Sequence, residues 1–211
     1  MREEYWVRQR FVLDTNTLIY AAETWDEGYR RAVEWARVKE ARPRGFLAGR
    51  RYGEAVARHV LDLCALGEAE CVVPEVVVHE VELTGEEDLR SRALELVALA
   101  KVRVVRGLDI SELYRLVPRE LQHEVRRVVE SARRRGEKVG LPMSADPYLL
   151  LLALKKGYTL VTTDRKLADL AQRLGIDVVY PVARRVKVGE AKYRPRPAIT
   201  PTFTRTPRLA R

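Results

Sequence analysis

The chain has 211 residues, of which 46% are hydrophobic and 33% are charged, a balance that suits one folded domain with appendages. No apolar stretch approaches the roughly 20 residues of a membrane span, and the first residues, MREEYWVRQR, lack the apolar segment of a signal peptide. We therefore expect a cytoplasmic protein without membrane association. Cys64 and Cys71 lack the histidine partners and close pairs of a zinc site, so we expect them to be small core residues.

The net charge of +9 is concentrated at the end of the sequence. Residues 184–211 contain nine basic residues against one acid, which leaves residues 1–183 nearly neutral. The basic residues of this tail are Arg184, Arg185, Lys187, Lys192, Arg194, Arg196, Arg205, Arg208 and Arg211. Four prolines spaced through the tail predict an extended chain without a core. Such charge favours contact with nucleic-acid phosphates, and a solubilising or partner-docking extension is the alternative.

The first predicted element is a buried strand at residues 11–13, which ends abruptly on Asp14 and is followed by a helix over residues 18–23. In an open parallel sheet the ligand crevice lies at the carboxyl ends of the strands, so Asp14 would face it. Asn16, the only asparagine in the chain, follows two positions later. The alternative is that Asp14 or Thr15 only caps the helix.

The rest of the sequence alternates helical and strand patterns, which predicts a parallel sheet covered by helices on both faces. Helices are expected at residues 26–40, 52–66, 74–83, 86–100, 110–135, 144–157 and 165–174. Strands are expected at residues 69–73, 101–106, 158–161 and 177–180. We interpret residues 136–143 as a loop and place a break in the long helix near Pro118. The result is one domain over residues 1–183, with a helical insertion at about residues 85–140.

Four acids occupy positions from which they could converge above this sheet. Asp14 and Asp164 each follow a strand, Asp146 begins the most apolar helix, and Glu80 lies in the helix after the second strand. Each has a simpler interpretation as a helix cap or, for Glu80, as one of several solvated acids that include Glu82. Carboxylates without histidine or thiol partners suit a hard cation, so we expect Mg²⁺ or Mn²⁺. Such a cation activates an attacking water and stabilises the leaving oxygen of a phosphodiester.

Three sequence blocks carry a resemblance to a known family. FVLDTNTLIYA, PEVVVHEVE and SADPYLLLLALKKGYTLVTTDRKLADLAQRLGIDVVY resemble, in that order, the signature blocks of the PIN-domain nucleases, over Arg10 to Pro181. The resemblance implies a Rossmann-like, three-layer α/β/α fold with a central parallel sheet and extra helices. It also implies a nuclease that uses Mg²⁺ or Mn²⁺ to hydrolyse RNA. The family's metal-binding acids fall on Asp14, Glu80, Asp146 and Asp164, and its polar residues near the site fall on Asn16 and Thr162.

The chain departs from the family pattern in two places. Apolar residues follow Asp146 where some members carry a further acid, and the interval between Glu80 and Asp146 is long. In the length of this interval the chain resembles the PIN proteins with helical insertions, including the small protein-only ribonuclease P type, more than it resembles the compact toxins. Whether Glu80 or Glu82 reaches the site stays open, although residues two positions apart on a helix point in different directions, so only one of them can do so.

We therefore predict a metal-dependent endoribonuclease that acts in RNA processing, of rRNA or tRNA, or in RNA decay. The alternatives are a toxin ribonuclease held by an antitoxin and a non-catalytic PIN scaffold that binds RNA or protein. RNA is the expected partner, and a homo-oligomer or an RNA-processing protein partner stays open. The basic run of Arg133, Arg134, Arg135 and Lys138 would contact the RNA backbone together with the tail, or would simply be a solvated helix end.

Overall fold

The computed structural model describes residues 9–23 and 46–180, so the predicted helix at residues 26–40 and the basic tail at residues 184–211 lie outside the described residues. A five-stranded sheet forms the centre of the described part. Its strands are β1 (Gln9–Leu13), β2 (Ala69–Pro74), β3 (Arg103–Val105), β4 (Thr159–Val161) and β5 (Val178–Val179). Their order is β3-β2-β1-β4-β5, and every pair is parallel. The predicted α/β class with a parallel sheet is confirmed.

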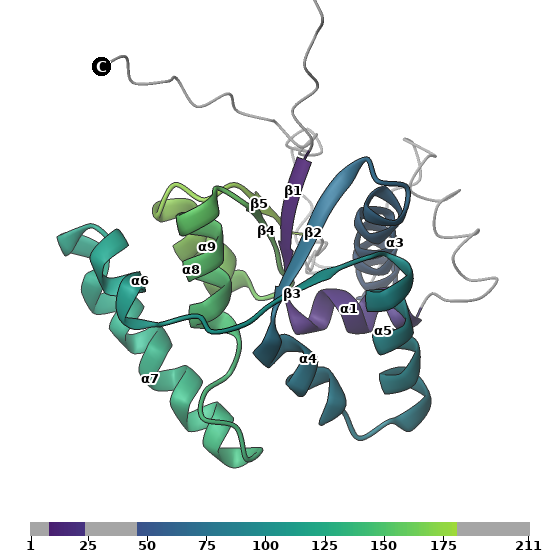
Figure 1. Cartoon of the computed structure of the whole chain (residues 1–211), viewed down its shortest axis with the longest axis horizontal. Helices are drawn as coiled ribbons and strands as arrows, with labels where there is room; N and C mark the ends of the chain where they lie inside the picture. Colours follow the sequence, from purple (N-terminus) through teal and green to yellow (C-terminus); the bar gives the residue numbers. More distant parts are fainter. Residues whose placement is uncertain (1–8, 24–45, 181–211) are drawn as a thin grey trace, which may run out of the picture.

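Helices cover both faces of the sheet (Figure 1). They are α1 (Thr15–Glu23), α3 (Phe46–Ala65), α4 (Glu75–Glu82), α5 (Glu87–Leu99), α6 (Ser111–Leu116), α7 (Gln122–Lys138), α8 (Asp146–Lys156) and α9 (Arg165–Arg173), with a 3-10 turn, η1, at Arg119–Leu121. Helices α1, α3 and α5 lie on one side of the sheet, and α8 and α9 lie on the other, with α6 and α7 outside α8 (Figure 1). The arrangement is a three-layer α/β/α fold.

Strand order places a topological switch point at the carboxyl end of β1. The chain runs from β1 outward to β2 and β3, and then crosses back to add β4 and β5 on the other side of β1. Connections therefore leave β1 and β4 toward opposite faces, and such a switch point is where open parallel sheets bind ligands. Asp14 directly follows β1, and Thr162 directly follows β4.

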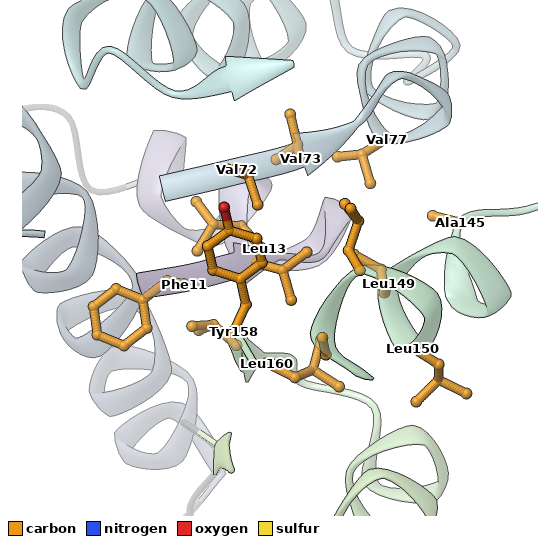
Figure 2. Close-up of a cluster of buried hydrophobic side chains, with 14 of the residues drawn as sticks. Phe11, Leu13, Val72, Val73, Val77, Ala145, Leu149, Leu150, Tyr158 and Leu160 are labelled. Atoms are coloured by element: carbon orange, nitrogen blue, oxygen red, sulfur yellow. The ribbon is translucent and has the colours of Figure 1, made fainter. Parts of the chain in front are cut away.

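Helix α8 forms the centre of the core on its side of the sheet. Its residues 149–152 are four leucines, each at most 2% exposed. The helix is apolar on all sides because the sheet covers its inner face while α6 and α7 cover its outer face. Figure 2 shows part of this core, where side chains from β1, β2, β4 and α8 gather in one cluster. The start of α8, which carries Asp146, is thereby fixed relative to the strands.

Two local features differ from the sequence prediction. Cys64 of α3 and Cys71 of β2 are buried, as expected of core residues, but their sulfurs are also joined in a disulfide with a Cα–Cα distance of 5.8 Å. Gly136 lies within α7 and not in a loop, because that helix continues to Lys138. Across residues 9–23 and 46–180, no helix is long and apolar enough to cross a membrane.

Candidate functional site

Asp14 lies at the junction of β1, α1 and β4, with only 5% of its surface exposed. Its backbone N–H donates to the carbonyl oxygen of Val161 at 3.1 Å, which ties the end of β1 to the end of β4. Its Oδ1 accepts a hydrogen bond from the N–H of Thr17 at 2.7 Å, and Oδ2 accepts from the Thr162 hydroxyl and from the N–H of Thr163 at 3.2 Å. Asp14 therefore caps α1 and also joins the two central strands.

Burial without a contacting cation changes the acidity of Asp14. Loss of solvent raises the pKa of Asp14 from 3.8 to about 6, although the Thr162 hydroxyl and the N–H groups of Thr17 and Thr163 act in the opposite direction. Charge on this carboxylate is thus unfavourable in the protein as it stands. A cation bound nearby would remove that penalty.

Glu80 of α4 connects three elements through the two oxygens of its carboxylate. Its Oε1 accepts a hydrogen bond from the N–H of Ala145 at 2.9 Å, and its Oε2 accepts one from the Thr15 hydroxyl. Burial raises the pKa of Glu80, and the negative charge of Asp146 raises it further. Glu82, in contrast, is exposed and lies 3.1 Å from Nδ1 of His79. Of the two glutamates, Glu80 is the one that faces the start of α8.

Asp146 is the first residue of α8, but its side chain does not cap that helix. It forms an ion pair with Arg135 from the last turn of α7 instead. Burial raises the pKa of Asp146 and the charge of Asp164 adds to the effect, while the Arg135 guanidinium lowers it. Among the described residues, Arg135 is the cation that contacts one of the four predicted acids.

Asp164 caps α9, as the simpler interpretation of this residue proposed. Its Oδ1 accepts hydrogen bonds from the N–H groups of Lys166 at 2.7 Å and Leu167 at 3.2 Å. Both bonds use the same oxygen, which leaves Oδ2 without a partner in the described part of the chain. The N–H of Asp164 donates to the Thr162 hydroxyl at 3.1 Å, so this hydroxyl links Asp164 to Asp14.

The structure thus brings the four predicted acids to one edge of the sheet and links them in two pairs. Asp14 is linked to Asp164 through Thr162, and the negative charge of Asp146 acts on Glu80. As the side chains stand, no three histidine, cysteine or acidic residues within residues 9–23 and 46–180 are grouped closely enough to bind one ion. Movement of side chains, above all of Arg135 away from Asp146, would be needed before several carboxylates could share a cation.

The other predicted residues divide into three groups. Thr162 directly contacts Asp14, whereas Asn16 is exposed in the first turn of α1 and its side chain makes no hydrogen bond within the described ranges. The predicted basic residues Arg133, Arg134 and Lys138 are exposed and lie in the last two turns of α7. The predicted contacts at Arg184, Arg185, Lys187, Arg194 and Arg196 lie outside the described residues.

The sequence did not reveal the roles of Thr15 and Thr17. Both hydroxyls serve the acids, because that of Thr15 donates to Glu80 and that of Thr17 lies 3.1 Å from Oδ1 of Asp14. The only signal in the sequence is the run DTNT, in which four polar residues separate the apolar strand before it from the apolar stretch after it. That run indicates a polar junction, but it does not indicate which acid each hydroxyl meets.

No protein-family model matches this chain, and no curated protein matches it either. Membership of the PIN-domain family therefore stays a prediction from the three sequence blocks. The geometry at the carboxyl edge of the sheet is an independent basis for a proposal about function.

Proposed function

We propose that the protein is a metal-dependent endoribonuclease of the PIN-domain type that hydrolyses RNA phosphodiester bonds in RNA processing or decay. The observation that carries this proposal is the convergence of Asp14, Glu80, Asp146 and Asp164 at one edge of the sheet, where three of their carboxyl pKa values are raised. Acids with raised pKa values at a sheet switch point are typical of a site that gains a positive charge when it works.

The chemistry of the side chains fits a hard divalent cation. Asp14, Glu80, Asp146 and Asp164 offer carboxylate oxygens, which are the ligands that Mg²⁺ and Mn²⁺ prefer. The cluster already attracts a cation, since Arg135 contacts Asp146 and is held there by opposite charge. When bound, a divalent ion would activate the attacking water and stabilise the leaving oxygen of the phosphodiester.

The protein's own residues position the acids and the RNA. Asp14 and Glu80 are oriented by hydroxyl and N–H donors. The Asp14 carboxylate therefore keeps a fixed place at the ends of β1 and β4, and that of Glu80 keeps one beside the start of α8. Exposed cations at the end of α7 lie on the helix that delivers Arg135 to the site, and they provide contacts for the phosphates flanking the cleaved bond. The tail at residues 184–211 would add attraction that does not depend on sequence.

The test is cleavage of a labelled structured RNA by the parent, Asp14→Asn and Asp146→Asn, each with Mn²⁺ and with chelator. We expect cleavage by the parent with Mn²⁺ alone and a loss of at least about 100-fold in both variants. Asp177→Asn is the matched control, because Asp177 is an exposed aspartate at the start of β5, at the opposite edge of the sheet. Cleavage that persists in chelator, or in both site variants, would rule out the metal mechanism.

A non-catalytic protein that binds RNA is the second candidate. It is favoured by the ion pair between Arg135 and Asp146, because a site whose acid already has a counter-ion can persist without a metal. The same experiment separates the two functions. RNA binding by the parent without cleavage in Mn²⁺ or Mg²⁺ would favour the non-catalytic role.

A further inference from the structure

Arg135 is held at the site by the way the end of α7 packs. The N–H of Ser144 donates to the carbonyl oxygen of Ala132 at 3.0 Å. The N–H of Leu141 donates to the carbonyl oxygen of Gly136 at 2.9 Å. A Cβ atom on Gly136 would lie 2.6 Å from the Cα atom of Met143, so only glycine permits this close approach. The last turn of α7 is therefore fixed against the segment that leads into Asp146.

From this position Arg135 neutralises a cluster and not only one acid. Its guanidinium donates to Oδ2 of Asp146. Partial burial lowers the pKa of Arg135, but the bond to Asp146 and the charges of Asp146, Asp164 and Glu80 outweigh this effect and raise it above its usual value. The guanidinium thus lies in the negative field of the same acids that would bind a divalent cation.

We propose that Arg135 is an internal counter-ion that a divalent cation must displace from Asp146 before it can bind. This inference rests on the proposed function, because it concerns the regulation of the same site. Arg135 and the incoming ion compete for the same carboxylate, since the guanidinium donates to Oδ2, one of the two oxygens that a cation could use, and its positive charge would repel the ion. The Asp146 side chain is 19% exposed, whereas that of Arg135 is 45% exposed, so Arg135 can turn outward without opening the core.

Displacement has a consequence for the substrate. A guanidinium that leaves Asp146 stays at the rim of the site, on the same helix end as Arg133 and Arg134. Phosphate offers it a new partner with two parallel hydrogen bonds, which suits arginine better than lysine. RNA binding would thus favour release of Asp146, and by linkage it would favour binding of the metal.

A purely structural ion pair predicts a different result. In that case loss of Arg135 would loosen the end of α7 and would leave the affinity for metal unchanged or weaker. Competition predicts the reverse, because removal of the competing cation leaves Asp146 free for the ion. The affinity for metal therefore distinguishes the two roles without any measurement of cleavage.

The experiment is calorimetric titration of the full chain with Mn²⁺, for the parent, Arg135→Gln and Arg127→Gln. Arg127 is the matched control, because it is an exposed arginine of α7 that forms no ion pair within the described ranges. We expect Arg135→Gln to bind Mn²⁺ about three- to tenfold more tightly, in line with the loss of one partly exposed ion pair and its neighbouring charges. Arg127→Gln should change the affinity by less than about twofold.

Arg135→Met keeps the unbranched apolar stem of the side chain at the helix end, and it replaces Arg135→Gln if circular dichroism shows that the latter does not fold. Tighter Mn²⁺ binding by either Arg135 variant, but not by Arg127→Gln, supports the competition. Equal or weaker binding overturns it. If the parent binds Mn²⁺ and cleaves RNA while the Arg135 variants keep its affinity, only this inference fails. If no variant binds Mn²⁺, both this inference and the proposed function fail.

Discussion

Replacement of Asp14 by asparagine should stabilise the metal-free protein at neutral pH, although substitution of a buried, hydrogen-bonded residue normally destabilises. Asp14 is 5% exposed and has no cation in contact with it among the described residues. Its folded-state pKa of about 6 lies above the ordinary value of 3.8. The stability that Asp14 contributes is therefore fully present below pH 3.8, and it is lost as the pH rises through about 6.

The size of this effect follows from the two pKa values. The change from 3.8 to about 6 corresponds to about 3 kcal/mol of lost unfolding free energy at pH 7. Asparagine removes this cost but places an NH₂ group where the aspartate accepted hydrogen bonds. The NH₂ group replaces only one of the two oxygens. In place of Oδ2 it faces the Thr162 hydroxyl, which can turn to accept from it, and the N–H of Thr163, which cannot, at a cost of about 1–2 kcal/mol, while the remaining oxygen still accepts from the N–H of Thr17. We expect a net gain of about 1–2 kcal/mol at pH 7.

The assay is urea unfolding of the parent, Asp14→Asn and Asp177→Asn in chelator at pH 4 and pH 7. The difference between Asp14→Asn and the parent should shift by about 2 kcal/mol in favour of the variant between these pH values. Asp177→Asn should stay within about 0.5 kcal/mol of the parent at both. Mn²⁺ should reverse the order at pH 7, because it binds the folded parent and stabilises it. A variant that is less stable by the same amount at both pH values would refute the reasoning.

Three further predictions concern the core, the disulfide and the tail. Leu149→Ala should lower the unfolding free energy by about 2–5 kcal/mol in urea, since Leu149 is fully buried in α8, and a loss below about 1 kcal/mol would contradict its place there. Reduction of the bond between Cys64 and Cys71 should lower the unfolding free energy by about 2–3 kcal/mol, and a melting temperature unchanged by reductant would show that the bond does not contribute. Removal of the residues after Pro181 should weaken RNA binding and flatten its salt dependence, and an unchanged salt slope would give the tail another role.

Local pattern was enough to predict the α/β class and most elements, because apolar runs and helical periodicity are properties of neighbouring residues. The strand before Asp14 and the apolar helix after Asp146 are the clearest cases. The sequence could not predict which side chains meet. The bond between Thr15 and Glu80 spans 65 positions, and the ion pair of Arg135 with Asp146 depends on how α7 packs against the next loop.

Cysteines and glycines show the same limit on a smaller scale. Spacing could argue against a zinc site at Cys64 and Cys71, but it could not show that a turn brings their Cα atoms to 5.8 Å. A glycine at position 136 suggested a loop, since glycine often ends a helix. It lies inside α7 instead, and glycine is required at this position since the backbone near Met143 leaves no room for a Cβ atom. Tertiary packing, which pattern does not reveal, decides both cases.

Asp14 and Glu80 at the carboxyl edge of the sheet differ from Glu70 at the amino edge in their electrostatic surroundings, and this contrast supports a cation site at the carboxyl edge. At the amino edge, Glu70 accepts hydrogen bonds from Arg103 at 2.6 Å and from the Tyr158 hydroxyl at 3.1 Å. Chiefly through the bond from Arg103, the pKa of Glu70 is lowered. At the carboxyl edge, burial raises the pKa of Asp14 and Glu80.

In the described part of the chain, Glu70 at the amino edge thus has a counter-ion, and the partly exposed Glu75 at the carboxyl edge pairs with Arg106 at 3.0 Å. The more buried Asp14 and Glu80 are left with a deficit of positive charge. A deficit of this kind costs stability, as the folded-state pKa of about 6 for Asp14 indicates. Arg135 offsets part of it through Asp146, but its contact does not extend to Asp14. The charge left uncompensated at this edge is what a divalent cation would neutralise, so the proposed function accounts for a cost that packing alone does not explain.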